Sequence, residues 1–158
     1  MGNLREELKQ RKPFRNLREE AVLNVWRTAD FLAHHLQVLL KTRGVSQTQY
    51  NVLRILRGAG KEGIALGEIA GRMLTHDPDI TRLMNRLVRR GLARRVRIRE
   101  DRRVILARIT AAGVKLLADL EGPVEQLIDE MMGALNGSQM EALIALLERA
   151  RSSHDLNR

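Results

Sequence analysis

The chain has 158 residues, of which 44% are hydrophobic, enough for one domain with a real core. It has no cysteine, which excludes disulfides and cysteine redox sensing, and no apolar run approaches the roughly 18 residues that a membrane span requires. Its charged N-terminus has no apolar segment, so a secretory signal is not predicted and the cytoplasm is the expected location.

The positive charge is concentrated in residues 80–108. This stretch holds eleven arginines and two acids, so its net charge of +9 equals that of the whole chain. Such a cluster favours a polyanionic partner, because arginines that pair with phosphates release condensed counterions. Aromatic residues, which stack on unpaired bases, make up only 3% of the chain. A DNA duplex is therefore favoured over single strands or RNA.

The first half of the chain predicts helices. The first dozen residues are expected to fray, and apolar residues at steps of three or four predict a long helix over 14–41, ended by Gly44. Ser46 and Gln49 form a capping box that opens a second helix. A very short strand at residues 64–65 and a short helix over 66–73 follow.

The next helix is predicted over residues 78–90, with Asp77 as its N-cap and Pro78 in its first position, and it stops at Gly91. One face is apolar, and the opposite face carries Thr81, Arg82, Asn85, Arg86 and Arg89. A recognition helix needs this division, because one side packs on the protein while the other enters the major groove.

The polar face of this helix suggests separate roles for its side chains. Arg82, Asn85 and Arg86 are assigned to base edges, since arginine pairs with guanine and asparagine with adenine. Thr81 is assigned to a phosphate or a methyl group, and Arg89 to the DNA backbone. The alternative is a solvated basic face on an ordinary amphipathic helix. The adjacent basic segment favours DNA.

After Gly91 the apolar period changes from helical to alternating. Residues 93–99 and 103–109 are separated by Glu100–Arg102, which predicts a β-hairpin. A short helix, a turn, a basic helix and a hairpin together form a winged helix-turn-helix. The predicted fold class is therefore mainly α, with the wing over 94–108 and a helical dimerisation platform built from the terminal helices.

The C-terminal third predicts two more helices. Thr110 is the expected cap of a long apolar-striped helix, which Gly122-Pro123 should kink or interrupt. Ser138 and Glu141 suggest a second capping box for the final helix. Apolar stripes at both ends of a small chain favour a homodimer, while folding back within the chain is the alternative.

Several short motifs between residues 46 and 117 are specific in combination: Ile69-Ala70, Thr81-Arg82, Arg90-Gly91-Leu92, Asp101-Arg102-Arg103 and Ile109-Thr110. Together they resemble the core of the MarR family of transcriptional regulators. The resemblance implies a homodimer on a pseudo-palindromic operator, with intertwined terminal helices. It divides the chain into dimerisation segments 1–43 and 111–158 and a DNA-binding lobe over 44–110.

The resemblance also assigns the tip of the wing. Arg103 is expected in the minor groove with Asp101 buttressing it, and an arginine in a narrow minor groove is also the physical expectation for a basic hairpin. Arg95 and Arg102 complete the expected DNA contacts. The alternative for Asp101 is a turn residue with a weak surface ion pair.

An effector is a further implication of the resemblance. Related proteins bind small aromatic or lipophilic compounds between platform and lobe, and the candidates here are Trp26, His34, His35 and Tyr50, each of which plain packing or exposure also explains. Asp30 with His34, and His76 with Asp77 and Asp79, are loose metal spacings that lack a further ligand. No metal or other cofactor is predicted.

The predicted function is sequence-specific binding of double-stranded DNA by a transcriptional regulator, a repressor that a small effector releases. The alternative is an architectural protein without sequence preference, whereas a regulator prefers an inverted repeat of roughly 16–20 bp. An enzyme is not predicted, because the sequence has no nucleophile–base signature and no phosphate-binding glycine pattern.

Overall fold

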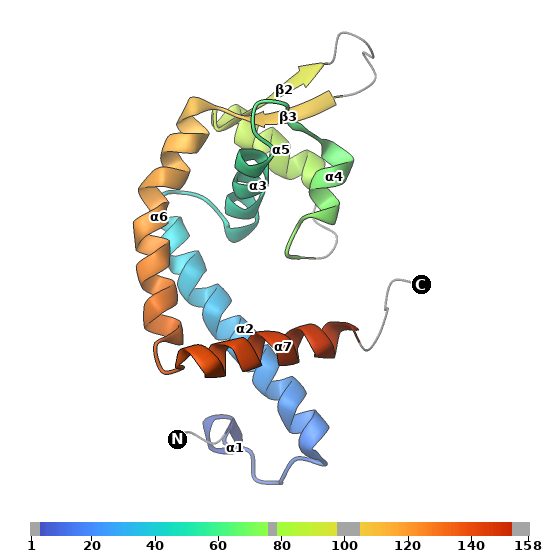
Figure 1. Ribbon diagram of the computed structural model, residues 1–158, viewed down its shortest axis with the longest axis vertical. Helices are drawn as coiled ribbons and strands as arrows, with labels where there is room; N and C mark the ends of the chain where they lie inside the picture. Colours follow the sequence, from blue (N-terminus) through green and yellow to red (C-terminus); the bar gives the residue numbers. More distant parts are fainter. Residues whose placement is uncertain (1–3, 76–78, 98–104, 153–158) are drawn as a thin grey trace. The chain divides into compact units, whose positions relative to one another are not determined.

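Helices and three short strands follow one another along residues 4–75, 79–97 and 105–152, which the computed structural model describes (Figure 1). Contacts divide the chain into a first unit, Met1–Val124, and a second unit, Glu125–Arg158. The elements are α1 (Leu4–Glu7), α2 (Leu17–Lys41), α3 (Gln47–Gly58), β1 (Ile64–Ala65), α4 (Leu66–Gly71), α5 (Ile80–Arg89), β2 (Ala93–Arg97), β3 (Ile105–Ile109), α6 (Ala111–Met132) and α7 (Gly137–Ser152).

The N-terminal segment is more ordered than the sequence suggested. Leu4 is buried at the start of α1, and the Arg5 side chain donates hydrogen bonds to the carbonyls of Gln10 and Arg11, at 3.3 and 3.1 Å. The expectation of a frayed first dozen was therefore wrong for residues 4–12. Helix α2 begins at Leu17 because the side chain of Asn16 accepts a hydrogen bond from the Glu19 N–H, at 3.0 Å.

The capping box expected at Ser46 and Gln49 is confirmed, and it opens α3. The one expected at Ser138 and Glu141 was wrong by two residues. Asn136 is the cap of α7: its side-chain oxygen accepts from the Gln139 N–H at 3.0 Å, and the Gln139 side chain accepts from the Asn136 N–H at 3.0 Å. Asparagine is as good a cap as serine, so spacing alone does not choose between the two boxes.

Helix α6 is continuous through Pro123, so the expected interruption did not occur. Proline removes one backbone hydrogen bond, but Gly122 and Pro123 are both exposed, where water can satisfy the freed carbonyl. Thr110 caps this helix as predicted, accepting a hydrogen bond from the Gly113 N–H at 3.1 Å.

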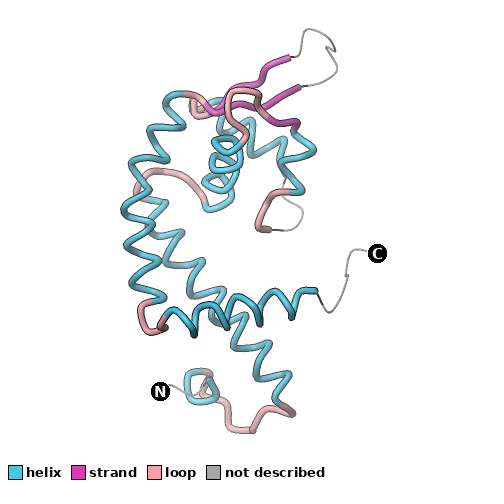
Figure 2. Tube along the Cα trace, in the orientation of Figure 1, coloured by secondary structure: helices cyan, strands magenta, loops and turns pink. Residues whose placement is uncertain are grey.

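The three strands form one antiparallel sheet in the order β1-β3-β2 (Figure 2). In this register Ile64 and Arg95 are both paired with Ala107, the central residue of β3. The short strand predicted at residues 64–65 is thus the third strand of the sheet. The hairpin of β2 and β3 is confirmed.

The core of the first unit lies between the sheet and the helices around it. It contains the fully buried side chains of Leu40, Val52, Leu53, Leu56, Ile69, Met84, Leu87, Ala107 and others. Helix α6 approaches the sheet closely at Gly113, where a Cβ atom would collide with the Leu92 carbonyl oxygen and the Ile109 side chain. This core holds α5 and the hairpin in one rigid lobe.

The second unit consists of the C-terminal end of α6 and the helix α7. Helix α7 has no buried residue among those described, and Ile144 and Leu146 are exposed. In the described part of the chain, no helix is long and apolar enough to cross a membrane.

Candidate nucleic-acid interface

Helix α5 begins at Ile80, two residues later than predicted. The carboxylate of Asp79 is its cap, accepting a hydrogen bond from the Arg82 N–H at 2.9 Å. A carboxylate at this end also interacts favourably with the helix dipole. The expected cap at Asp77 was therefore wrong in position, and Asp77 and Pro78 lie outside the described residues.

The two faces of α5 are clearly separated. Ile80, Met84 and Leu87 are buried in the core of the first unit. Val88, expected on the same face, is 37% exposed, so apolar packing weakens toward the C-terminal end of the helix. All five side chains proposed to contact DNA, Thr81, Arg82, Asn85, Arg86 and Arg89, are exposed. The helix therefore presents a continuous polar face to solvent.

The described part of the hairpin adds three exposed arginines, Arg94, Arg95 and Arg97. Residues paired across two strands lie on the same face of a sheet. Arg94 is paired with Arg108 on one face, while Arg95 and Arg97 are paired with Ala107 and Ile105 on the other. Both faces of the hairpin therefore carry positive charge. Asp101, Arg102 and Arg103 lie outside the described residues, and their roles stay predictions.

Two arginines of residues 80–108 donate hydrogen bonds to backbone carbonyls of the protein. The Arg90 guanidinium donates to the carbonyls of Gly44 and Arg43, at 2.5 and 3.3 Å. Arg108 donates from Nε to the Glu62 carbonyl, at 3.2 Å, and its side chain lies against Gly63. These two residues hold parts of the lobe together, a role that charge counting did not reveal.

The other described arginines of the stretch stay available to an anionic partner. Within residues 4–75, 79–97 and 105–152 the ion pairs are Arg27–Glu7, Arg57–Glu121, Arg72–Glu68 and Lys115–Asp119. None of these pairs involves the arginines of α5 or β2. Helix α5 packs against β2 in the same unit, so the two sets of guanidiniums belong to one rigid lobe.

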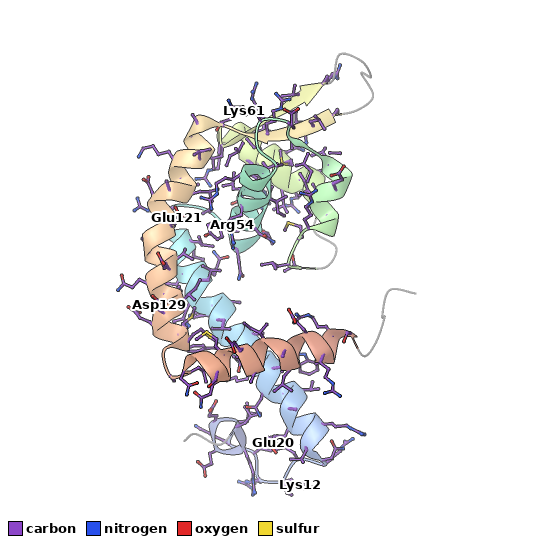
Figure 3. The ribbon with its side chains drawn as sticks, viewed as in Figure 1. Lys12, Glu20, Arg54, Lys61, Glu121 and Asp129 are labelled. Carbon is purple, nitrogen blue, oxygen red and sulfur yellow. The ribbon has the colours of Figure 1, made fainter. Side chains whose placement is uncertain are left out.

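One more cation lies at this end of the lobe. Lys61, labelled in Figure 3, is exposed in the turn that leads into β1, at the end of the lobe where the hairpin extends. Composition and spacing did not single out Lys61, because the contact that brings β1 to β3 is long-range in the chain.

Tyr50, one of the four effector candidates, lines a cavity. Tyr50 is 9% exposed and forms part of the wall of a cavity of about 270 Å³. The other lining residues come from α2, α3 and the segment after α4: Ala33, Leu36, Gln47, Thr48, Asn51, Arg54, Leu74 and Thr75. The guanidinium carbon of Arg54 lies 5.9 Å from the centre of the Tyr50 ring. Among the described residues of the wall, Arg54 is the cation, and the sequence did not indicate it (Figure 3).

The other three candidates are exposed and do not line this cavity. Trp26 is 66% exposed. His35 is 2.9 Å from the Phe31 carbonyl through Nδ1, and its ring packs on Phe31 and His34. Among the described residues, no three histidine, cysteine, aspartate or glutamate side chains form a group that could hold a metal ion.

The short helix α4, the turn after it, the basic helix α5 and the arginine-rich hairpin define a winged helix-turn-helix DNA-binding protein. The family model described as "MarR family" matches residues 45–105. The chain is 30% identical over 115 residues to the HTH-type transcriptional regulator MhqR of Bacillus subtilis (strain 168). The matched residues cover 73% of this chain and 78% of MhqR.

Solved structures support the same family assignment. A MarR transcription factor from Planctomyces limnophilus is 43% identical, with a TM-score of 0.67 over 86% of this chain and 98% of that one. A mutant MarR from E. coli complexed with operator DNA is 20% identical and shares the fold, with a TM-score of 0.74 over 94% of this chain and 99% of that one. The chain therefore belongs to the MarR family: it is a DNA-binding transcriptional regulator and not an enzyme.

Proposed function

We propose that the protein is a homodimeric repressor that reads a pseudo-palindromic operator with α5 in the major groove and the wing in the minor groove. The observation that carries this proposal is the set of exposed arginines on α5 and β2, none of which pairs with a carboxylate of the described residues. Unpaired guanidiniums on one rigid lobe suit a surface of regularly spaced phosphates. Since its ligand is chromosomal DNA, we infer that the protein acts in the cytoplasm.

The dimensions of α5 support major-groove binding. An α-helix with its side chains is about 10–12 Å across, which fits a major groove roughly 12 Å wide, and α5 has ten residues to lay in it. Asn85 and Arg86 follow Arg82 by three and four residues, so the three side chains share one face. We assign them to base edges, Thr81 to a phosphate or a methyl group, Arg89 to the backbone, and Arg95, Asp101, Arg102 and Arg103 to the wing contacts.

The dimer is supported by apolar side chains that the chain leaves exposed. On α2 these are Val22, Val25 and Trp26, and on α7 they are Ile144 and Leu146. Exposed apolar side chains on a helix face suit an interface with a second copy. A two-fold dimer places two copies of α5 on half-sites about one helical turn apart, which is the geometry of an inverted repeat.

The effector proposal concerns the cavity beside Tyr50. Its wall combines aliphatic side chains and one aromatic ring with the single guanidinium of Arg54. Such a lining suits a small aromatic carboxylate, because the ring is buried against apolar groups while the carboxylate pairs with arginine. The cavity contacts α2 and α3, so a ligand there changes the packing on which α5 rests.

Selection from a random duplex library tests the function directly. The full-length protein is incubated with random 20-bp duplexes in about 0.15 M salt, and the bound pool is sequenced after several rounds. The proposal expects enrichment of one inverted repeat with half-sites a helical turn apart. A pool that stays random despite tight binding would support the architectural alternative and contradict the proposal.

A further inference from the structure

A single turn follows the C-terminal end of α5. It consists of Arg90, Gly91 and Leu92, and we call it the α5–β2 turn. Gly91 has a φ of +68°, and the Leu92 N–H donates to the Leu87 carbonyl at 3.0 Å. This is the usual glycine-dependent end of a helix. The turn therefore fixes both where α5 ends and where the wing begins.

Arg90 joins this turn to the end of α2. Helix α2 ends in the same way, with Gly44 at a φ of +68° and the Val45 N–H donating to the Leu40 carbonyl at 3.2 Å. The two hydrogen bonds from Arg90 reach the carbonyls of Gly44 and Arg43 at this end. Both carbonyls lie in the turn just beyond Lys41, the last residue of α2. A planar guanidinium reaches both of them at once, which a lysine ammonium group does less well.

Thr110 joins the same turn to the start of α6. Its hydroxyl donates to the Gly91 carbonyl at 2.6 Å, and its N–H donates to the Leu92 carbonyl at 3.1 Å. The α5–β2 turn is therefore bonded to both long helices of the first unit.

We propose that Arg90 is a positioning residue for DNA recognition, which holds the C-terminal end of α5 in register with α2. The proposal rests on the proposed function, in which α5 reads the operator. The packing of α5 explains why such a restraint is needed: Ile80, Met84 and Leu87 anchor it in the core, but Val88, nearest this end, is partly exposed. Base reading requires side chains held within about 0.5 Å, so a loosely held helix end reduces specificity.

The competing role for Arg90 is a direct contact with a DNA phosphate. The two roles differ in what they need from the side chain. A phosphate contact needs positive charge, which lysine supplies, and it contributes to binding of any duplex. A positioning contact needs two donors in a fixed plane, and it contributes only where the exact placement of α5 matters.

The experiment compares Arg90→Lys and Arg90→Gln with Arg89→Lys and Arg89→Gln, made at the neighbouring exposed arginine. The probes are the duplex selected from the library and a scrambled duplex of equal length and composition. Dissociation constants are measured over a salt series by fluorescence anisotropy. Each variant is measured well below its own thermal midpoint, so that all of the protein is folded.

Both Arg90 variants are expected to bind the selected duplex roughly threefold to tenfold more weakly, since two charge-assisted hydrogen bonds in partial solvent are lost. Their binding to the scrambled duplex and their salt dependence stay as in the wild type. Arg89→Lys keeps the positive charge at the proposed phosphate contact, so it is expected to lose a little affinity, by the same factor on both duplexes. Arg89→Gln loses affinity for both duplexes, and the slope of log K against log salt falls by about one.

Three results would overturn the proposal. Arg90→Lys binding like the wild type would show that charge suffices. A loss by Arg90→Gln on both duplexes would indicate a phosphate contact or a partly unfolded protein. Unchanged binding by both variants would show that the link has no role in recognition. If the wild-type protein does not distinguish the two duplexes, the proposed function is contradicted, and the inference about Arg90 is contradicted with it.

Discussion

Arginines that are identical in chemistry have two different roles in this lobe. Those of α5 and β2 have exposed guanidiniums, whereas Arg90 and Arg108 donate to the backbone carbonyls of neighbouring turns. The sequence predicted the cluster and its charge because charge is a property of composition. It did not predict this division, because the carbonyl partners of Arg90 lie 46 and 47 residues away along the chain.

Substitution of one base-reading residue gives the sharpest test at this scale. Arg86→Ala is expected to weaken binding to the selected duplex by roughly 1–3 kcal/mol and to relax the base preference at one position, because a bidentate contact with guanine is lost. Binding to a panel of single-base variants of the duplex measures both effects. Lys12→Ala is the matched control. It also removes one positive charge, and Lys12 lies between α1 and α2, away from the hairpin (Figure 3). An unchanged base preference in Arg86→Ala would contradict the assignment.

A second prediction concerns the cation of the cavity. Benzoate at millimolar concentration is expected to raise the thermal midpoint of the wild type, because a ligand that binds only the folded state stabilises it. Arg54→Gln is expected to lose most of this shift, since the carboxylate loses its ionic partner. Arg57→Gln on the same helix, outside the cavity wall, should retain it. Equal shifts in all three proteins would contradict the role of Arg54.

At the scale of elements, the sequence predicted helix ends and turns best where the nearby residues allow a single arrangement. The capping box at Ser46 and the hairpin after Gly91 depend on neighbouring residues, and both are confirmed. The strand at residues 64–65 is confirmed as well, although its partner β3 is distant in the chain. The cap of α7 was missed because Asn136 and Ser138 are nearly equal as caps. The order at α1 was missed because it depends on side-chain contacts such as Arg5 with the Gln10 carbonyl.

The packing of α6 on the sheet gives a prediction about stability. Gly113→Ala is expected to destabilise the folded state by about 1–3 kcal/mol, because the added Cβ collides with backbone at Leu92 and must push α6 away. Gly58→Ala, at the last residue of α3 with open space around the added carbon, should instead stabilise that helix by up to about 1 kcal/mol. Urea unfolding of both variants measures the difference. A Gly113→Ala protein as stable as the wild type would contradict the close approach.

The wing is expected to contribute affinity more than specificity. With Arg94→Gln, Arg95→Gln and Arg97→Gln combined, the slope of log K against log salt should fall by roughly 2–3, since each phosphate contact contributes about 0.9. The base preference measured by the duplex panel should change little, because arginines of the wing are expected to contact the DNA backbone and to respond to groove shape. A changed base preference at an unchanged slope would instead place these arginines on base edges.

For the molecule as a whole, the feature that remains to be explained is the exposure of apolar side chains on α2 and α7. The sequence showed the stripes, but periodicity does not say whether a stripe packs within the chain or on a second copy. The exposure of Trp26 and Val25 favours the second copy. The division of the chain into dimerisation segments and a DNA-binding lobe follows from that reading and stays a prediction.

Trp26→Glu tests this reading at the scale of the assembly. A buried carboxylate without a partner is strongly unfavourable in an apolar interface, so the variant is expected to be monomeric at micromolar concentration in analytical ultracentrifugation. It should bind the inverted repeat no more tightly than a single half-site, because the second recognition helix is lost. Thr28→Glu adds the same charge to the same helix, two residues on and so nearly opposite, and should leave the dimer intact. A Trp26→Glu protein that remains dimeric and prefers the full repeat would show that α2 does not form the interface through this face.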